Sequence, residues 1–159
     1  QVLLDSRKVL GGWGQEPELR DHRLAVTVRG GARTLGVFDL ASGRFTKFRG
    51  DSCQIGWWPG QERVLWIEGH KGNGGTRIVS GPPDASRGDV LMDLPGKYSH
   101  EYYPRLTRDG SWLVWAASAG DHEPGVADYE IFLWKVGEPW DRAQRLTHHT
   151  GNDQWPDAR

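Results

Sequence analysis

The stretch YYPRLTRDGSWLVW, residues Tyr102–Trp115, has the pattern of a strand, a tight turn and a second strand. Asp109 and Gly110 supply the turn, because these residue types adopt the backbone conformations that tight turns need. Side chains of the second strand alternate between two faces, one with Trp112, Val114 and Ala116 and the other with Leu113, Trp115 and Ala117. Both faces are apolar, which predicts a middle strand packed between neighbouring sheets.

This pattern recurs along the chain at intervals typical of a repeat protein. Successive copies begin at Pro17, Gln54, Pro104 and Pro156, so their starts are 37, 50 and 52 residues apart. A period of ~40–50 residues is typical of the four-stranded blades of a β-propeller. In each complete unit a polar, Gly-rich loop follows the apolar strand, and a third strand and a weaker fourth strand come after it.

We therefore predict an all-β chain, a β-propeller segment of four-stranded antiparallel blades with about three complete blades. Residues 1–159 form this single segment, with blades at approximately 15–50, 53–93 and 100–147 and flanking strands at 2–5 and 154–158. A β-sandwich of regular hairpins is the alternative. Because an open arc of three blades would leave apolar faces uncovered, we expect a piece of a longer propeller or a ring completed by other copies of the chain.

The composition argues against some classes of function. The chain has 20 basic and 21 acidic side chains and a net charge of -1, which provides no electrostatic footprint for nucleic acid. No apolar run approaches the roughly 18 residues of a membrane span. The single cysteine, Cys53, cannot form an internal disulfide, and we expect it to be a small buried strand residue.

The third unit resembles the WD40-like (PD40) repeat of TolB-type β-propellers. The resemblance rests on YYPRLTRDGSWLVW, DYEIFLW and QRLTHHTGNDQWPD, within residues 98–157, and extends more loosely to residues 15–50. The second unit departs from the pattern at Trp57-Trp58-Pro59-Gly60, and Thr107-Arg108 replaces the usual Ser-Pro. The resemblance implies a propeller, usually six-bladed, in bacteria and often periplasmic or extracellular. It implies no particular activity, because the fold serves many functions.

Polar pairs precede each unit's proline and are candidates for the mouth of a central channel. They are Gln15-Glu16, His100-Glu101 and Asn152-Asp153. Together their side chains would form a partial acidic ring that holds a cation or a basic peptide. The alternative is that these side chains cap turns and bond to backbone amides of neighbouring blades.

The loop before the third unit's third strand concentrates acidic residues. Asp121, Asp128 and Glu130 supply the hard oxygen ligands that suit Ca²⁺, but they lack the regular spacing of a calcium loop. A solvated acidic loop is the alternative. His148 and His149 do not form a metal pair, because adjacent strand residues point to opposite faces. We expect no other cofactor.

The nine tryptophans divide into two groups. Most lie in predicted strands, where packing between blades explains them. Trp13, Trp140 and Trp155 lie in or beside loops and are candidates for stacking on a ligand or partner. We predict a non-enzymatic scaffold for a protein or peptide partner; the alternative is the propeller domain of an enzyme that processes polysaccharide or peptide.

Overall fold

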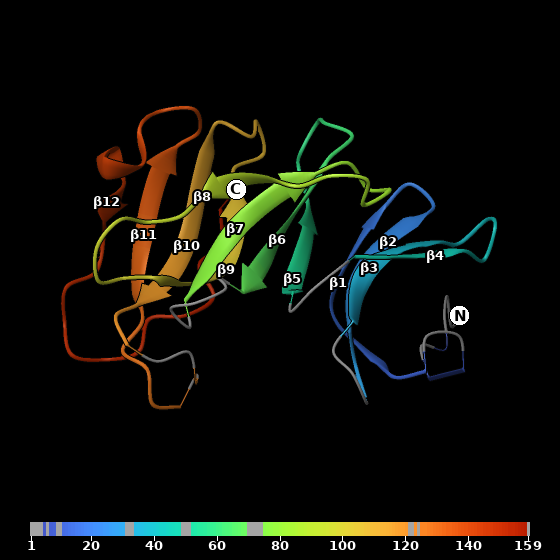
Figure 1. Cartoon of the computed structure of the whole chain (residues 1–159), viewed down its shortest axis with the longest axis horizontal. Coiled ribbons are helices and arrows are strands. Elements are labelled where there is room, and N and C mark those ends of the chain that lie inside the picture. Colours follow the sequence, from blue (N-terminus) through green and yellow to red (C-terminus); the bar gives the residue numbers. More distant parts are fainter. Residues whose placement is uncertain are drawn as a thin grey trace.

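The computed structural model describes residues 5, 7–8, 11–30, 34–48, 52–69, 75–120, 123 and 125–158. In this part of the chain, twelve strands form three four-stranded antiparallel sheets, each with its strands in sequence order. Figure 1 shows the three sheets side by side in chain order. The predicted architecture, a partial propeller of about three blades, is confirmed.

The sheets are described here as blades 1, 2 and 3. Blade 1 contains β1 (Trp13–Arg20), β2 (Arg23–Arg29), β3 (Thr34–Asp39) and β4 (Phe45–Lys47). Blade 2 contains β5 (Ser52–Trp57), β6 (Val64–Gly69), β7 (Thr76–Gly81) and β8 (Asp89–Met92). Blade 3 contains β9 (His100–Leu106), β10 (Trp112–Ser118), β11 (Glu130–Lys135) and β12 (Gln144–Arg145), with a 3-10 turn, η1, at Trp140–Arg142. No helix in the described residues has the length and apolar character that a membrane crossing requires.

Two apolar clusters hold the blades together, and β6 contributes to both. Its Val64 and Trp66 pack with residues of blade 1, whereas Leu65 and Ile67 pack with residues of blade 3. All four side chains are at most 5% exposed. Alternate residues of one strand therefore bury apolar surface against two different neighbours, which explains why this strand is apolar on both faces.

The first strand of each blade carries the same β-bulge. In β1 the bulged pair is Glu16-Pro17, in β5 it is Gln54-Ile55 and in β9 it is Tyr103-Pro104, each opposite a single residue of the second strand. The first residue of each pair has a positive φ, of 49°, 55° and 55° respectively. Proline suits the second position because a bulged residue need not donate to the strand ladder.

The preceding blade supplies a partner for the backbone N–H of the bulge residue. Thr27 Oγ1 of blade 1 accepts a hydrogen bond from Gln54 N of blade 2, at 2.9 Å. Gln54 Oε1 in turn accepts one from Tyr103 N of blade 3, at 2.7 Å. These bonds tie the bulges of blades 2 and 3 to the blade before each of them, at the level of the first strands.

The bulges correct the predicted register of the second unit. The repeat pattern aligns Gln54 with Pro17 and Pro104, but the bulge geometry makes Gln54 the counterpart of Glu16 and Tyr103. Ile55 therefore occupies the position of the proline. Because this unit lacks the proline that marks the position elsewhere, its alignment from sequence was one residue wrong.

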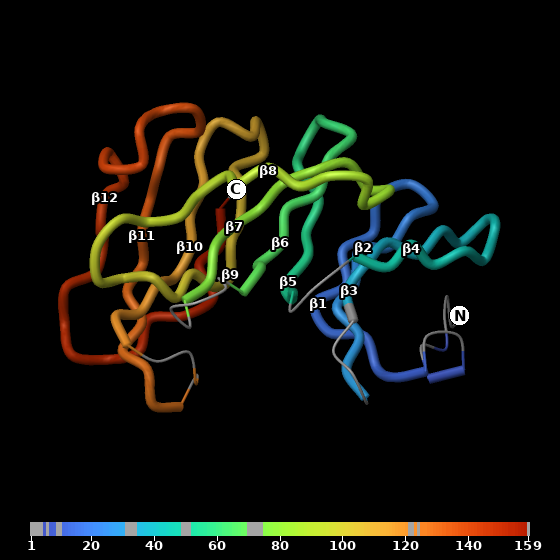
Figure 2. The backbone as a smooth tube through the Cα atoms, viewed as in Figure 1, coloured from blue at the N-terminus to red at the C-terminus, as the bar shows by residue number. Residues whose placement is uncertain are grey.

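The predicted strand at 154–158 is also corrected, because these residues form no strand in the structure. Trp155 nevertheless has a φ of 54°, the conformation of the three bulge residues, and it precedes Pro156 just as Tyr103 precedes Pro104. The segment runs back beside β9, as the tube in Figure 2 shows. It thus has the local shape of a first strand without a paired second strand. The other predicted flanking strand, 2–5, lies outside the described residues except for Asp5, which is not in a strand.

Candidate functional site

The bulges bring together side chains that are far apart in the sequence. We use the name bulge cluster for the four residues of positive φ that open the repeats, namely Glu16, Gln54, Tyr103 and Trp155. Gln54 contacts Tyr103 through the hydrogen bond described above, and the rings of Tyr103 and Trp155 have centroids 5.4 Å apart. Non-glycine residues of positive φ are uncommon and concentrate at functional sites, so this cluster is the leading candidate for a site.

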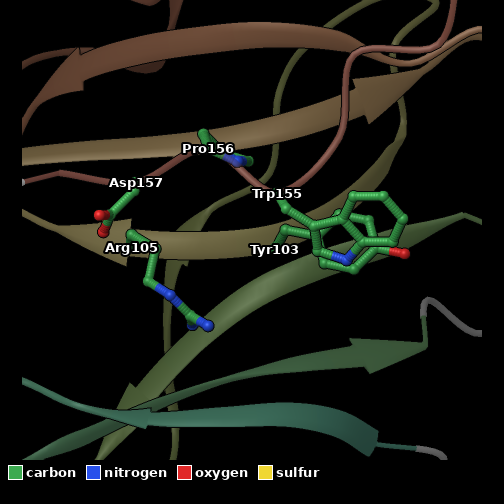
Figure 3. A pocket seen from close by; sticks show the side chains of 5 residues that line it. All are labelled: Tyr103, Arg105, Trp155, Pro156 and Asp157. Carbon is green, nitrogen blue, oxygen red and sulfur yellow. The ribbon is translucent and has the colours of Figure 1, made fainter.

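A pocket of about 240 Å³ lies beside the bulge cluster. It is lined by Tyr103, Arg105, Trp155, Pro156 and Asp157. Figure 3 shows the Trp155 and Tyr103 rings together at one end, while Arg105 extends away from them. The Trp155 side chain is 66% exposed, whereas Tyr103 is only 8% exposed. The pocket therefore has a buried phenol ring behind an open indole face, with one basic and one acidic side chain.

Glu18 holds Arg105 in place from blade 1. Its Oε1 atom lies 3.4 Å from Arg105 Nη1, and its Oε2 atom accepts a hydrogen bond of 2.8 Å from Trp57 N. A Cβ atom at Gly56 would lie only 3.0 Å from this carboxylate, so glycine gives Glu18 room to reach across blade 2. One side chain of blade 1 thus contacts both other blades.

Burial and neighbouring charges act on the bulge cluster as well. Burial raises the pKa of Glu16, and the positive charges of Arg105 and Arg29 oppose this effect. Burial also raises the pKa of Tyr103, with a further contribution from the negative charge of Glu16. Tyr103 is therefore a neutral phenol at physiological pH, and it offers a hydrogen-bonding hydroxyl and an aromatic face.

Glu101 does not lie at an open channel mouth, which corrects the prediction for this residue. Its side chain is fully buried between blades 2 and 3, where Oε1 accepts a hydrogen bond of 2.7 Å from Leu94 N. Burial is the main cause that raises its pKa from 4.5 to about 8, and nearby Asp93 also raises it. Glu101 thus bonds to a backbone amide of the neighbouring blade, which was the alternative reading of the polar pairs. His100, beside it, is half-buried.

The three polar pairs do not occupy equivalent positions, so they form no acidic ring of the predicted kind. Glu16 is itself a bulge residue, whereas Glu101 and Asp153 each lie two residues before one. Asp153 is half-buried and lies 3.1 Å from His149 Nε2. Asn152 is exposed, and its side-chain oxygen accepts a hydrogen bond of 2.8 Å from Gln154.

Glu130 and Asp128 of the blade 3 loop have different surroundings in the structure. Glu130 is buried and its carboxylate bonds to Arg145 and Thr147. Asp128 is exposed and lies 3.4 Å from Gly151 N. Asp121 lies outside the described residues, and within them no three His, Cys, Asp or Glu side chains come together as a metal site. Calcium binding by this loop stays a prediction.

The three candidate tryptophans lie in different places. Trp155 lines the pocket. Trp140 is 37% exposed, and its indole N–H donates to Leu91 O across to β8, at 3.0 Å. Trp13 is 56% exposed at the start of β1. Trp155 is therefore both exposed and part of the pocket lining.

Sequence reasoning selected Glu16 and Trp155 but missed Gln54, Tyr103 and Arg105. Tyr103 had a visible signal, because it directly precedes the proline of its unit as Glu16 and Trp155 precede theirs. Gln54 had none, since its unit has Ile55 in place of the proline. The sequence also gave no indication that Arg105 would be held by a side chain of blade 1.

Two TolB structures are similar to this chain in fold. One is TolB from Acinetobacter baumannii, with a TM-score of 0.60 and 14% identity. The match covers 84% of this chain and 31% of the Acinetobacter chain. The other, assigned as TolB, is from Agrobacterium tumefaciens, with a TM-score of 0.64 and 15% identity. That match covers 79% of this chain and 45% of the Agrobacterium chain. The fold is therefore that of a TolB-like β-propeller. This chain spans less than half the length of either structure.

A third structure, the β-propeller domain of the Trilobed protease from Pyrococcus furiosus, has 8% identity and a TM-score of 0.48. The matched region covers 86% of this chain and 57% of the protease chain. No family model matches the sequence, and no curated protein does either.

The buried Glu101 carboxyl predicts that stability falls as pH rises. Its pKa is raised in the folded state, so its contribution is complete below its ordinary value of 4.5 and is lost as the pH approaches 8. Between pH 5 and pH 8 this group should lower the free energy of unfolding by about 4 kcal/mol, as an upper estimate. Urea denaturation at several pH values measures the change.

Glu101→Gln should remove most of this pH dependence, because glutamine keeps the oxygen that accepts from Leu94 and cannot ionise. Glu123→Gln, at an exposed position, is the matched control and should leave the dependence unchanged. An equal pH dependence in the wild type and in Glu101→Gln would show that this carboxyl is not its source.

Proposed function

We propose that the chain is a non-enzymatic β-propeller scaffold that binds a peptide segment of a partner protein in the pocket between β9 and residues 155–157. The observation that carries this proposal is the exposed Trp155 indole, backed by the Tyr103 ring in a pocket that Arg105 and Asp157 also line. Aromatic and arginine side chains are the residue types that contribute most to protein recognition. A volume of about 240 Å³ suits one or two side chains of a peptide.

Contacts around the pocket hold its lining side chains in place, so we expect these side chains to move little when a peptide binds. The backbone N–H of Tyr103 donates to Gln54 Oε1, and the Tyr103 ring contacts the Tyr129 ring, whose centroid is 6.2 Å away. Arg105 is fixed by Glu18. A site whose side chains are already ordered loses less conformational entropy on binding, which raises affinity without added contact area.

Ring completion by association is a separate proposal, supported by apolar side chains on the two outer blades. Trp13 and Leu19 of blade 1 are 56% and 54% exposed, and Leu146, just after β12 of blade 3, is 50% exposed. These side chains would be covered if copies of the chain, or further blades of a longer one, packed against both ends. The resemblance to TolB-type propellers also supports a location in the periplasm or outside the cell.

Light scattering at micromolar concentration tests association between copies. Burial of the exposed side chains at both ends predicts a mass of at least two chains of 17.9 kDa. Leu19→Asp should return the mass to that of one chain, whereas Val126→Asp, on an exposed loop, should not. A single-chain mass throughout the concentration series would overturn this proposal.

Selection from a random peptide library tests the binding function. Peptides that bind the chain should lose at least tenfold in affinity on Trp155→Ala, because truncation of a central aromatic contact commonly costs about 2 kcal/mol. Trp13→Ala is the matched control, since Trp13 is similarly exposed but lies outside the pocket lining, and it should keep the affinity.

A glycan array with the same variants tests the alternative, a domain of a polysaccharide-processing enzyme, because an exposed indole also stacks on sugar rings. Glycan binding that is lost in Trp155→Ala, together with no peptide binding, would overturn the scaffold proposal in favour of that alternative.

A further inference from the structure

Cationic side chains cover several aromatic rings of this chain. Trp57 lies under two guanidinium groups, with the Cζ atom of Arg20 5.4 Å and that of Arg23 5.0 Å from its ring centroid. Both arginines come from blade 1 and reach a tryptophan of blade 2. The negative face of an indole ring attracts a cation at these distances, so each contact contributes to the junction between the blades.

Two further rings have the same arrangement. Arg63 lies over Trp58, with its Cζ atom 5.9 Å from the ring centroid. Tyr98 has the ammonium of Lys97 and the guanidinium of Arg145 near its ring, each 5.0 Å from the centroid. The covering cations come from turns and strands of different blades, so the arrangement recurs independently of the local fold.

Trp155 differs from these rings. It is 66% exposed, and among the residues that the structure describes no cation lies over its ring. One side of the indole meets the Tyr103 ring at a centroid distance of 5.4 Å and an angle of 55°. The pocket therefore presents an electron-rich aromatic surface to whatever enters it.

The charges around the pocket favour a cation over an anion. Arg105 is the basic group of the lining, but Glu18 lies 3.4 Å from it, and Glu16 also interacts with its charge. Glu18 therefore counters this guanidinium directly, whereas Glu16 interacts with the charges of both Arg105 and Arg29. Asp157 adds a further carboxylate to the lining, and a carboxylate has about four lone-pair sites, so Asp157 is able to take a guanidinium or ammonium beside its other interactions.

We propose that the pocket takes an arginine or lysine side chain of the partner peptide, stacked on Trp155 with its charge directed to Asp157. This inference rests on the proposed function and adds the chemistry that the peptide must carry. Stacking uses the open indole face, and the carboxylate fixes the charged end. The partner thus completes at Trp155 the arrangement that Arg20 and Arg23 make at Trp57.

Fluorine NMR of protein labelled with 5-fluorotryptophan tests the inference, with the Trp155 signal assigned from Trp155→Phe. The probes are two acetylated Gly-X-Gly amides, one with arginine and one with citrulline, its neutral isostere. The arginine probe should bind about fivefold more tightly at Trp155, the ratio expected of an exposed cation–π contact. A lysine and acetyl-lysine pair should differ in the same direction.

Asp157→Asn should lower the preference for arginine over citrulline, because only arginine carries the positive charge that this carboxylate attracts. Asp141→Asn, at an exposed position in η1, is the matched control and should keep the preference. Equal binding of the arginine and citrulline probes, or no shift of the Trp155 signal with either, would overturn the inference.

The peptide library separates this outcome from failure of the proposed function. Library peptides that depend on Trp155 but carry no basic residue would overturn the inference and leave the scaffold function intact. A library without any Trp155-dependent binder would overturn both.

Discussion

The hydrogen bonds that join the bulges of blades 2 and 3 to the preceding blade set the geometry on which the rest of the structure depends. A bulged residue has no partner in its own strand ladder, so its backbone N–H would be costly to bury without another acceptor. Thr27 and Gln54 provide that acceptor at the two junctions between blades. The same conformation brings Gln54 against Tyr103, whose ring contacts Trp155, so one feature both aligns the blades and contributes to the candidate site.

The blades depend on one another for burial of their apolar faces and for partners of their polar groups. The middle strand β6 of blade 2 is apolar on both faces and packs against both neighbouring blades, as in other repeat proteins whose units contact adjacent units. Polar groups cross the same junctions: Glu18 reaches from blade 1 to Trp57 and Arg105, and Glu101 reaches from blade 3 to Leu94. The pocket is therefore supported by residues of all three blades rather than by one loop.

The sequence predicted the architecture better than the site, for reasons that particular residues show. Strand period and turn chemistry were sufficient to place the β9–β10 hairpin, because Asp109 and Gly110 separate two clear strands. The positive φ of Gln54 and Tyr103 leaves no periodic trace, so the bulge cluster was only partly found. Glu101 resembled an exposed acid in the sequence, yet its position two residues before a bulge places it against the neighbouring blade.

Hydrogen exchange of the Gln54 and Tyr103 amides, in the wild type and in Thr27→Val, tests most directly whether the bulges are held by the blade before them. Both amides should be protected as strongly as those of the flanking strands, although neither belongs to a ladder. In Thr27→Val, which removes the acceptor of Gln54 N, exchange at Gln54 should accelerate by about tenfold or more, in line with a loss of about 1–3 kcal/mol for an unsatisfied buried amide. Exchange of both amides as fast as in exposed loops, with no effect of Thr27→Val, would contradict the account.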